Sequence, residues 1–204
     1  MWFYGTIRIL FRVIALPMFR FRVYRADRVP RSGPAVVVAA HRSWLDPACV
    51  AGALPRPVRF LILESVYRKV WARWFYRAMR SIPVQSGQGP LSLGALRGAL
   101  RALGEGQLIG LFPEGRVFPE GPLGSLHAGA ALLAIRGRAP VIPVDIRGSS
   151  RAWPHGRAWP GPAPVRVRFG EPIDPPLETG REAAERFMAR IGAALAELAG
   201  EGCP

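Results

Sequence analysis

A histidine and an aspartate five residues apart are the first side chains in this chain that could do chemistry together. His41 follows the apolar run 35–40, and Asp46 comes after a short turn. A carboxylate that accepts a hydrogen bond from one imidazole nitrogen fixes the tautomer of the ring and makes the other nitrogen a better base. The spacing therefore indicates general-base catalysis. The structural alternative is a helix start, in which Asp46 before Pro47, or else Ser43, caps the helix.

A second group of polar residues follows another apolar run, at 107–112. Here Glu114, Gly115 and Arg116 form a turn, and Gly115 lets the backbone bend or approach a ligand closely. The planar fork of an arginine at this position can bind phosphate oxygens. The structural alternative is a salt bridge between Glu114 and an arginine.

Both groups follow patterns typical of buried strands, so the surrounding elements decide whether they meet. Apolar runs that alternate with helical periodicity predict an α/β fold, with a central, largely parallel or mixed sheet flanked by helices. Sites in such sheets lie at the carboxyl ends of the strands. We expect a loop at 153–164. The predicted strands are 35–40, 59–63, 82–85, 107–112, 141–146 and 165–169, and the helices include 91–103, 126–136 and 181–198.

Composition favours one globular domain that binds anionic partners. The 204 residues are 50% hydrophobic, which excludes a disordered tail, and their net charge is +14. Residues 1–80 hold fifteen basic residues against three acidic ones, so one end of the chain is strongly basic. Two cysteines, Cys49 and Cys203, and two histidines, His127 and His155, lack the spacing of a disulfide framework or a metal site. We expect no bound metal or cofactor and a reducing, cytoplasmic setting.

The first residues predict an amphipathic helix that lies on a membrane. Arg8 and Arg12 interrupt the apolar run before it reaches the ~20 residues of a membrane span, and no cleavage site follows. The alternative is an ordinary core helix. We divide the chain into a membrane-associating helical segment, 1–30, and a domain of catalytic size, 31–204. The apolar face would comprise Trp2, Phe3, Tyr4, Ile7, Leu10, Phe11 and Ile14.

A second basic, amphipathic helix is predicted at 66–80. Its apolar residues recur at helical spacing, and five basic residues occupy much of the remaining surface. Aromatic side chains suit the membrane interface, and each arginine near an anionic surface contributes about 1 kcal/mol. The alternative is that the aromatic face packs on the core and the arginines face solvent.

Three blocks in this order resemble the glycerolipid acyltransferase family, whose members include 1-acylglycerol-3-phosphate acyltransferases. The blocks are His41 with Asp46, Phe-Pro-Glu-Gly-Arg at 112–116, and Val-Ile-Pro-Val at 141–144. The resemblance implies transfer of a fatty acyl group from acyl-CoA or acyl carrier protein to the free hydroxyl of a lysophospholipid. It further implies that His41 is the base and Asp46 its orienting partner. The residues implied to bind the acceptor are Glu114, Gly115 and Arg116. The enzyme is expected to work at the cytoplasmic face of the membrane, as a peripheral or monotopic protein.

Departures from the family pattern leave the acceptor open. Ala40 stands where many relatives have asparagine, and the stretch 82–87 lacks the arginine of the family's second block. The Glu-Gly-Arg form of the third block is similar to that of lysophosphatidylethanolamine acyltransferase domains. The first candidate acceptor is 1-acylglycerol-3-phosphate, whose product is phosphatidic acid, and lysophosphatidylethanolamine is the alternative.

A basic chain with interleaved aromatic residues could also be a non-catalytic binder of nucleic acid or of membrane surfaces. No helix-turn-helix, zinc-finger or RNA-binding strand signature is present, so we expect no nucleic-acid partner. A serine hydrolase would need a Gly-x-Ser-x-Gly elbow, which the sequence lacks.

Overall fold

The structure is a computed structural model with a mixed seven-stranded sheet at its centre. It describes residues 17–68, 70–85, 92–115, 127–154 and 156–200, together with Gly5, Ile9 and Val13. The strands lie in the order β1-β7-β6-β2-β5-β3-β4. Their bounds are Arg22–Tyr24 (β1), Ala35–Ala39 (β2), Val58–Leu63 (β3), Ile82–Val84 (β4), Leu108–Leu111 (β5), Val141–Arg147 (β6) and Arg166–Phe169 (β7).

The sheet is parallel where the two polar groups of the sequence lie and antiparallel at one side. Strand β2 pairs in parallel with β5 and with β6, and β3 pairs in parallel with β5 and β4. Strand β7 runs antiparallel to β6, and β1 then pairs in parallel with β7. The carboxyl ends of β2 and β5 therefore meet at one edge of the sheet, as the α/β prediction requires.

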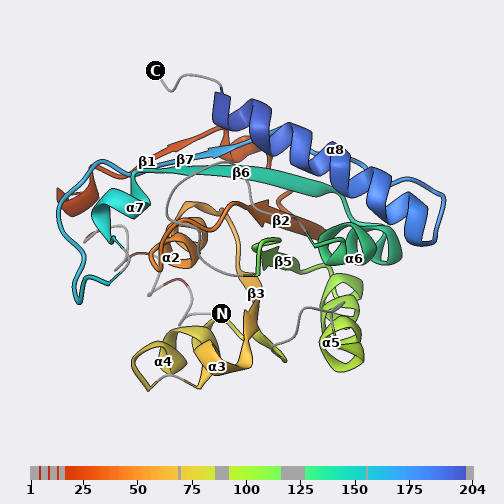
Figure 1. Ribbon diagram of the computed structural model, residues 1–204, viewed down its shortest axis with the longest axis horizontal. Coiled ribbons are helices and arrows are strands. Elements are labelled where there is room, and N and C mark those ends of the chain that lie inside the picture. The colour runs from red at the N-terminus through yellow and green to blue at the C-terminus, as the bar shows by residue number, and fades with distance from the viewer. Residues whose placement is uncertain are drawn as a thin grey trace.

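Helices cover both faces of the sheet. Helix α8 lies along β6, with α6 and α5 beside it, while α2, α3 and α4 lie on the opposite side (Figure 1). The bounds are Ala26–Arg28 (η1, a 3-10 helix), Asp46–Ala53 (α2), Glu64–Tyr67 (α3), Val70–Ala78 (α4), Leu93–Gly104 (α5), Gly129–Gly137 (α6), Ser149–Ala152 (α7) and Arg181–Gly200 (α8).

Strand β2 shows why its sequence is an unbroken apolar run. Successive side chains of a strand point to opposite faces, and here each face has its own core. Val36 and Val38 pack in the core under α5, α6 and α8, whereas Val37 packs in the core on the side of α2. All three side chains are at most 1% exposed. The strand can therefore carry no polar side chain until it leaves the sheet, at the position of the predicted base.

The six predicted strands are confirmed, as are the helices expected near 91–103, 126–136 and 181–198 and the loop at 153–164. The helix predicted at 66–80 is instead divided into α3 and α4. Helix α3 follows β3 without a connecting loop, so the end of the strand determines where this single turn lies. Strand β1 lies within the range 1–30, so the sheet begins inside the segment that the sequence predicts to be helical.

Helix α4 has both an inner and an outer side. Tyr76 is 5% exposed and packs in the core, whereas Trp74 is 59% exposed. Arg73 and Arg77 are exposed as well. The two alternatives for this helix are therefore not exclusive, because one aromatic residue packs inward and another faces outward between arginines.

The predicted N-terminal amphipathic face lies outside the described residues. Of that stretch the structure describes only Gly5, Ile9 and Val13, which are helical. Ile9 and Val13 are each 62% exposed. Among the described residues, no helix combines the length and the apolar character needed to cross a bilayer.

Candidate active site

The first group of polar residues lies where β2 leaves the sheet. His41 follows β2 by two residues, and Asp46 is the first residue of α2. The His41 Nδ1 and Asp46 Oδ2 atoms are 3.1 Å apart. The Asp46 side chain is fully buried, whereas the His41 side chain is 14% exposed. If Nδ1 carries the ring proton, it donates a hydrogen bond to Asp46. Nε2 then keeps a lone pair and can act as a base.

Backbone donors compensate the buried carboxylate of Asp46. Its Oδ2 atom accepts hydrogen bonds from the backbone N–H groups of Arg42 and Ser43, each at 2.7 Å. A carboxylate at the start of a helix also interacts favourably with the helix dipole. Together these contacts let an ionised side chain remain buried next to the imidazole.

The helix-cap alternative is wrong in its assignment of residues, although a helix does begin here. The N-cap of α2 is Leu45, and it makes no side-chain cap bond. The Asp46 carboxylate faces backward, toward the turn that precedes it. The Ser43 hydroxyl accepts a bond from the Leu45 N–H at 3.2 Å and donates one to the Trp153 carbonyl at 2.9 Å. Ser43 therefore attaches the turn between His41 and Asp46 to the segment that follows α7.

Glu114 meets His41 through the backbone. Its side chain is 6% exposed, and its Oε2 atom accepts a 2.9 Å hydrogen bond from the His41 N–H. This contact is possible because β2 and β5 are neighbours in register, with Val38 opposite Leu111. Glu114 thus connects the ends of two adjacent strands, and this contact does not depend on a bound substrate.

Gly115 completes the turn in a conformation that favours glycine. Its φ is +67°, and its N–H donates to the Phe112 carbonyl at 3.1 Å. The His127 N–H donates to the Pro113 carbonyl at 3.0 Å, so the start of the α6 region lies beside this turn. Arg116, the remaining predicted acceptor-binding residue, and His155 lie outside the described residues.

Replacing Glu114 tests its backbone contact. We expect Glu114→Ala to lower the free energy of unfolding by about 2 kcal/mol, because the half-buried His41 N–H loses its partner. Glu114→Gln should restore most of this loss, since the amide oxygen can accept the same bond. Urea unfolding of the two variants beside the wild type measures the difference. Equal unfolding midpoints for Glu114→Ala and the wild type would show that the bond contributes nothing.

An aromatic contact that the sequence did not predict completes the surroundings of His41. The Phe112 ring stacks on the imidazole, with centroids 4.2 Å apart and planes inclined by 24°. Phe60 continues the stack, 6.1 Å from Phe112 at 12°. The available signal was the aromatic residue at the end of the predicted strand 107–112.

Cys49 lies on α2, about one helical turn after Asp46, but is unsuited to carry an acyl group. It is buried, and burial, followed by the charge of Asp46, raises the pKa of its thiol well above the usual value. The thiolate, which is the nucleophilic form, is therefore suppressed. Within the described ranges, no three His, Cys, Asp or Glu side chains are grouped to hold a metal ion.

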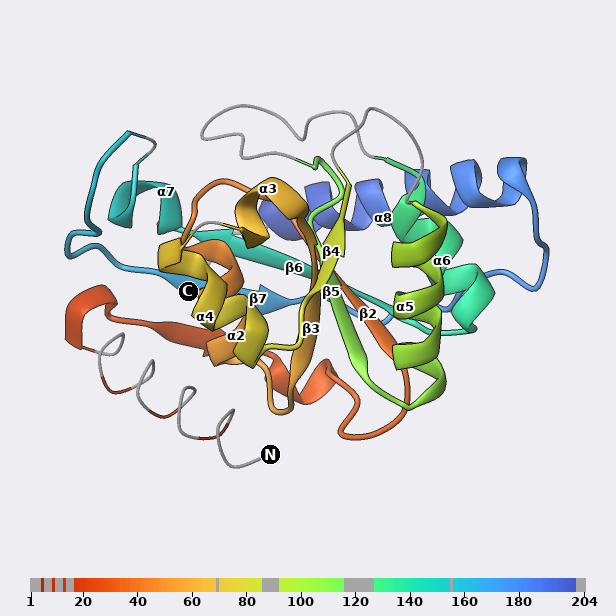
Figure 2. The same ribbon diagram turned by 90° about the horizontal axis from the view of Figure 1, so that it is seen from below.

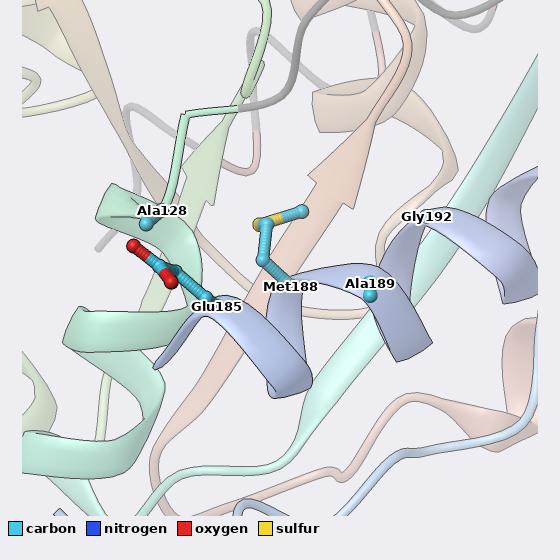
Figure 3. Close-up of a pocket in the computed structure, with 5 residues that line it drawn as sticks. All are labelled: Ala128, Glu185, Met188, Ala189 and Gly192. Carbon is cyan, nitrogen blue, oxygen red and sulfur yellow. The ribbon is translucent and has the colours of Figure 1, made fainter. Parts of the chain in front are cut away.

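A pocket of about 260 Å³ lies between α8 and Ala128, the residue before α6 (Figure 3). Neither His41 nor Asp46 is among its described lining residues. Its described lining consists of Ala128, Glu185, Met188, Ala189 and Gly192.

Comparison with known proteins relates this arrangement to one family. A family model described as Acyltransferase matches residues 20–147. The chain is 26% identical over 155 residues to a 1-acyl-sn-glycerol-3-phosphate acyltransferase of Bacillus subtilis, covering 74% of this chain and 73% of the relative. A protein of the same name from Pseudomonas aeruginosa is 25% identical over 193 residues, covering 93% and 73%. An N-acylphosphatidylethanolamine synthase of Arabidopsis thaliana is 29% identical over 164 residues, covering 71% and 57%.

The fold is shared with a solved relative. The crystal structure of the 1-acyl-sn-glycerophosphate (LPA) acyltransferase PlsC from Thermotoga maritima matches with a TM-score of 0.78, over 98% of this chain and 81% of that one, at 23% identity. The family match covers β1 to β6 and includes the dyad and the Glu114 turn. The chain therefore belongs to the acyltransferase family, in the glycerolipid branch that the three sequence blocks predict.

Proposed function

We propose that this enzyme transfers a fatty acyl group from an acyl thioester to the free hydroxyl of 1-acylglycerol-3-phosphate, giving phosphatidic acid. The observation that carries the proposal is the contact between His41 and the buried Asp46 at the edge of the sheet. The names of the bacterial relatives support the choice of acceptor. The donor is acyl-CoA or acyl carrier protein.

The proposed reaction needs no acyl-enzyme. The Nε2 atom of His41 takes the proton of the acceptor hydroxyl as its oxygen attacks the thioester carbonyl. The tetrahedral intermediate collapses, the carbon–sulfur bond breaks, and the departing thiolate takes the proton back from His41. Asp46 holds the ring and stabilises the transient imidazolium. The raised pKa of the Cys49 thiol agrees with a direct transfer, because that thiol is a poor nucleophile.

Acceptor binding is assigned to the turn at the end of β5. We propose that Arg116 holds the phosphate of the acceptor through its guanidinium fork, and that the backbone at Gly115 allows close approach. The buried carboxylate of Glu114 orients the main chain of His41 beside this turn. The base and the acceptor site are then coupled through one side chain.

The acceptor is tested by thiol release from palmitoyl-CoA with purified protein in detergent. We expect release that requires 1-acylglycerol-3-phosphate and is at least tenfold slower with lysophosphatidylethanolamine, because a head group whose phosphate carries an ethanolamine offers a smaller charge to Arg116. The reverse preference would assign the enzyme to the second acceptor. Release with neither acceptor, from acyl-CoA or from acyl carrier protein, would overturn the proposed reaction.

We further propose that the enzyme is peripheral or monotopic at the cytoplasmic face of the membrane. Within the predicted segment 1–30, the residues before β1 would form the membrane-associating part, and β1 belongs to the sheet of the catalytic domain. Near the start of the chain, the apolar side chains of Ile9 and Val13, which are not part of the predicted apolar face, are exposed and available for such a contact. For α4, support comes from the exposed Trp74 and its neighbouring arginines.

Charge removal from α4 tests the membrane contact. The double variant Arg73→Gln, Arg77→Gln should bind vesicles containing anionic phosphatidylglycerol about 30-fold more weakly, because each arginine near the surface contributes about 1 kcal/mol. Binding to neutral phosphatidylcholine vesicles should change little. Co-sedimentation at low ionic strength measures both.

A matched control exists on α5. Arg97 and Arg101 have the same spacing and are also exposed. Helix α5 lies on the other side of β3 from α4 in both views (Figures 1 and 2). Arg97→Gln with Arg101→Gln removes the same charge and should weaken binding much less. An equal loss in the two double variants would show that net charge, and not α4, determines membrane binding.

A further inference from the structure

Three rings form a column that leads from the core to the active-site edge. Phe60 is 1% exposed, Phe112 is half-buried, and His41 lies at the outer end. The two ring pairs are stacked at 4.2 Å and 6.1 Å, with inclinations of 24° and 12°. We call Phe60, Phe112 and His41 the aromatic column.

Gly110 makes room for Phe60, the innermost ring of the aromatic column. It lies on β5 directly opposite Phe60 on β3. A Cβ atom at Gly110 would stand 2.7 Å from two atoms of the Phe60 ring. The absent side chain lets Phe60 lie across β5, on the side where Phe112 emerges two residues later. A strand glycine thereby makes room for the buried ring that lies next to Phe112.

The contact with Asp46 does not fix the histidine ring by itself. One hydrogen bond at Nδ1 sets which edge of the imidazole faces Asp46, but the ring can still tilt about the line between Nδ1 and Oδ2. Such a tilt moves Nε2, the atom that must reach the acceptor hydroxyl. The flat face of Phe112, in contact with the imidazole, opposes this motion.

We infer that Phe112 is a positioning residue for His41, acting by the contact of its ring face with the imidazole. The inference rests on the proposed function, in which Nε2 is the base. Small misplacements of a reacting group are costly in rate even when binding is unchanged. The effect of losing the ring should therefore fall on kcat and not on KM.

Three variants separate positioning from packing. Phe112→Leu removes the flat ring and should lower kcat about tenfold, with KM for donor and acceptor unchanged. Phe112→Tyr keeps the ring and should stay within about threefold of the wild type. Phe60→Leu is the matched control, because it makes the same change one ring deeper, where the side chain does not contact His41. It should lower the melting temperature while kcat stays within about threefold.

A second readout does not depend on turnover. The ring current of Phe112 should shift the imidazole proton signals of His41 upfield in the NMR spectrum, and a His41→Ala variant assigns those signals. They should move downfield in Phe112→Leu and stay in place in Phe112→Tyr. If the proposed reaction is wrong, the wild type will not transfer acyl groups, yet these shifts will still report on the stack.

Two outcomes would overturn the positioning role. One is a kcat of Phe112→Leu within about twofold of the wild type while its His41 signals have moved, because the ring would then be in contact without effect on the rate. The other is an equal loss of kcat in Phe60→Leu and Phe112→Leu, which would attribute the effect to general packing of the core.

Discussion

Replacing His41 by alanine should lower kcat by about 10³-fold, within the range of 10² to 10⁴ that a positioned general base contributes. The reason is the loss of Nε2, the proposed acceptor of the hydroxyl proton. KM for the lysophospholipid should change little, because the acceptor site is assigned to the turn at Gly115 and Arg116. Thiol release from palmitoyl-CoA under saturating acceptor measures the loss.

The fold should survive this substitution. The hydrogen bond from the His41 N–H to Glu114 involves the main chain, so alanine retains it. The partly exposed imidazole leaves no deeply buried cavity. We expect the melting temperature to change by no more than a few degrees, because surface and half-buried changes of this kind cost little. Activity within tenfold of the wild type in a folded variant would remove His41 from the chemistry.

Two replacements of Asp46 should have different consequences. In Asp46→Asn the amide oxygen can still accept the N–H groups of Arg42 and Ser43, while the amide nitrogen takes the place of Oδ1. In the wild type, the Oδ1 atom of Asp46 is buried and has no hydrogen-bond partner among the described residues. The turn is then retained but the negative charge is lost. We expect kcat to fall about 10²-fold, and the buried amide N–H groups without an acceptor to lower the free energy of unfolding by about 1–3 kcal/mol.

Asp46→Ala should damage the structure as well. Two backbone N–H groups at the end of β2 lose their acceptor, and each buried unsatisfied group costs about 1–3 kcal/mol. We therefore expect the free energy of unfolding to fall by about 2–5 kcal/mol, in addition to the loss of activity. Urea unfolding of the two variants, run beside their kinetics, distinguishes the roles. A fully active Asp46→Asn enzyme would show that the carboxylate is needed for the turn alone.

The central strands β2, β5 and β6 could be predicted because burial on both faces leaves a strong sequence pattern. The elements that escaped prediction lack it. Strand β1 has three residues, two of them outside the core, and lies at the edge of the sheet. Helix α2, whose start the sequence offered only as the alternative for Asp46, is buried on nearly all sides, so its residues show no polar face from which a helical period could be recognised. Helix α7 is only four residues long.

The candidate site divides in the same way between local and distant contacts. The approach of His41 and Asp46 follows from five residues of sequence and could be predicted. The bond from His41 to Glu114 joins residues 73 apart and depends on the register of β2 with β5, which no local pattern specifies. The stack of Phe60 on Phe112 depends further on Gly110 and on the register of β5 with the neighbouring strand β3.

The edge strand β1 has a consequence for how the protein is made. Its partner is β7, with Arg22 in register with Arg166, so more than half of the chain separates the two strands. Pairings between such distant segments form late, since the intervening chain must first be synthesised and brought together. During translation the basic N-terminal residues are thus exposed long before the sheet can close over that edge. In the membrane-associated enzyme that we propose, the nascent chain would then meet an anionic bilayer first and complete its fold there, on the surface that supplies the proposed lipid acceptor.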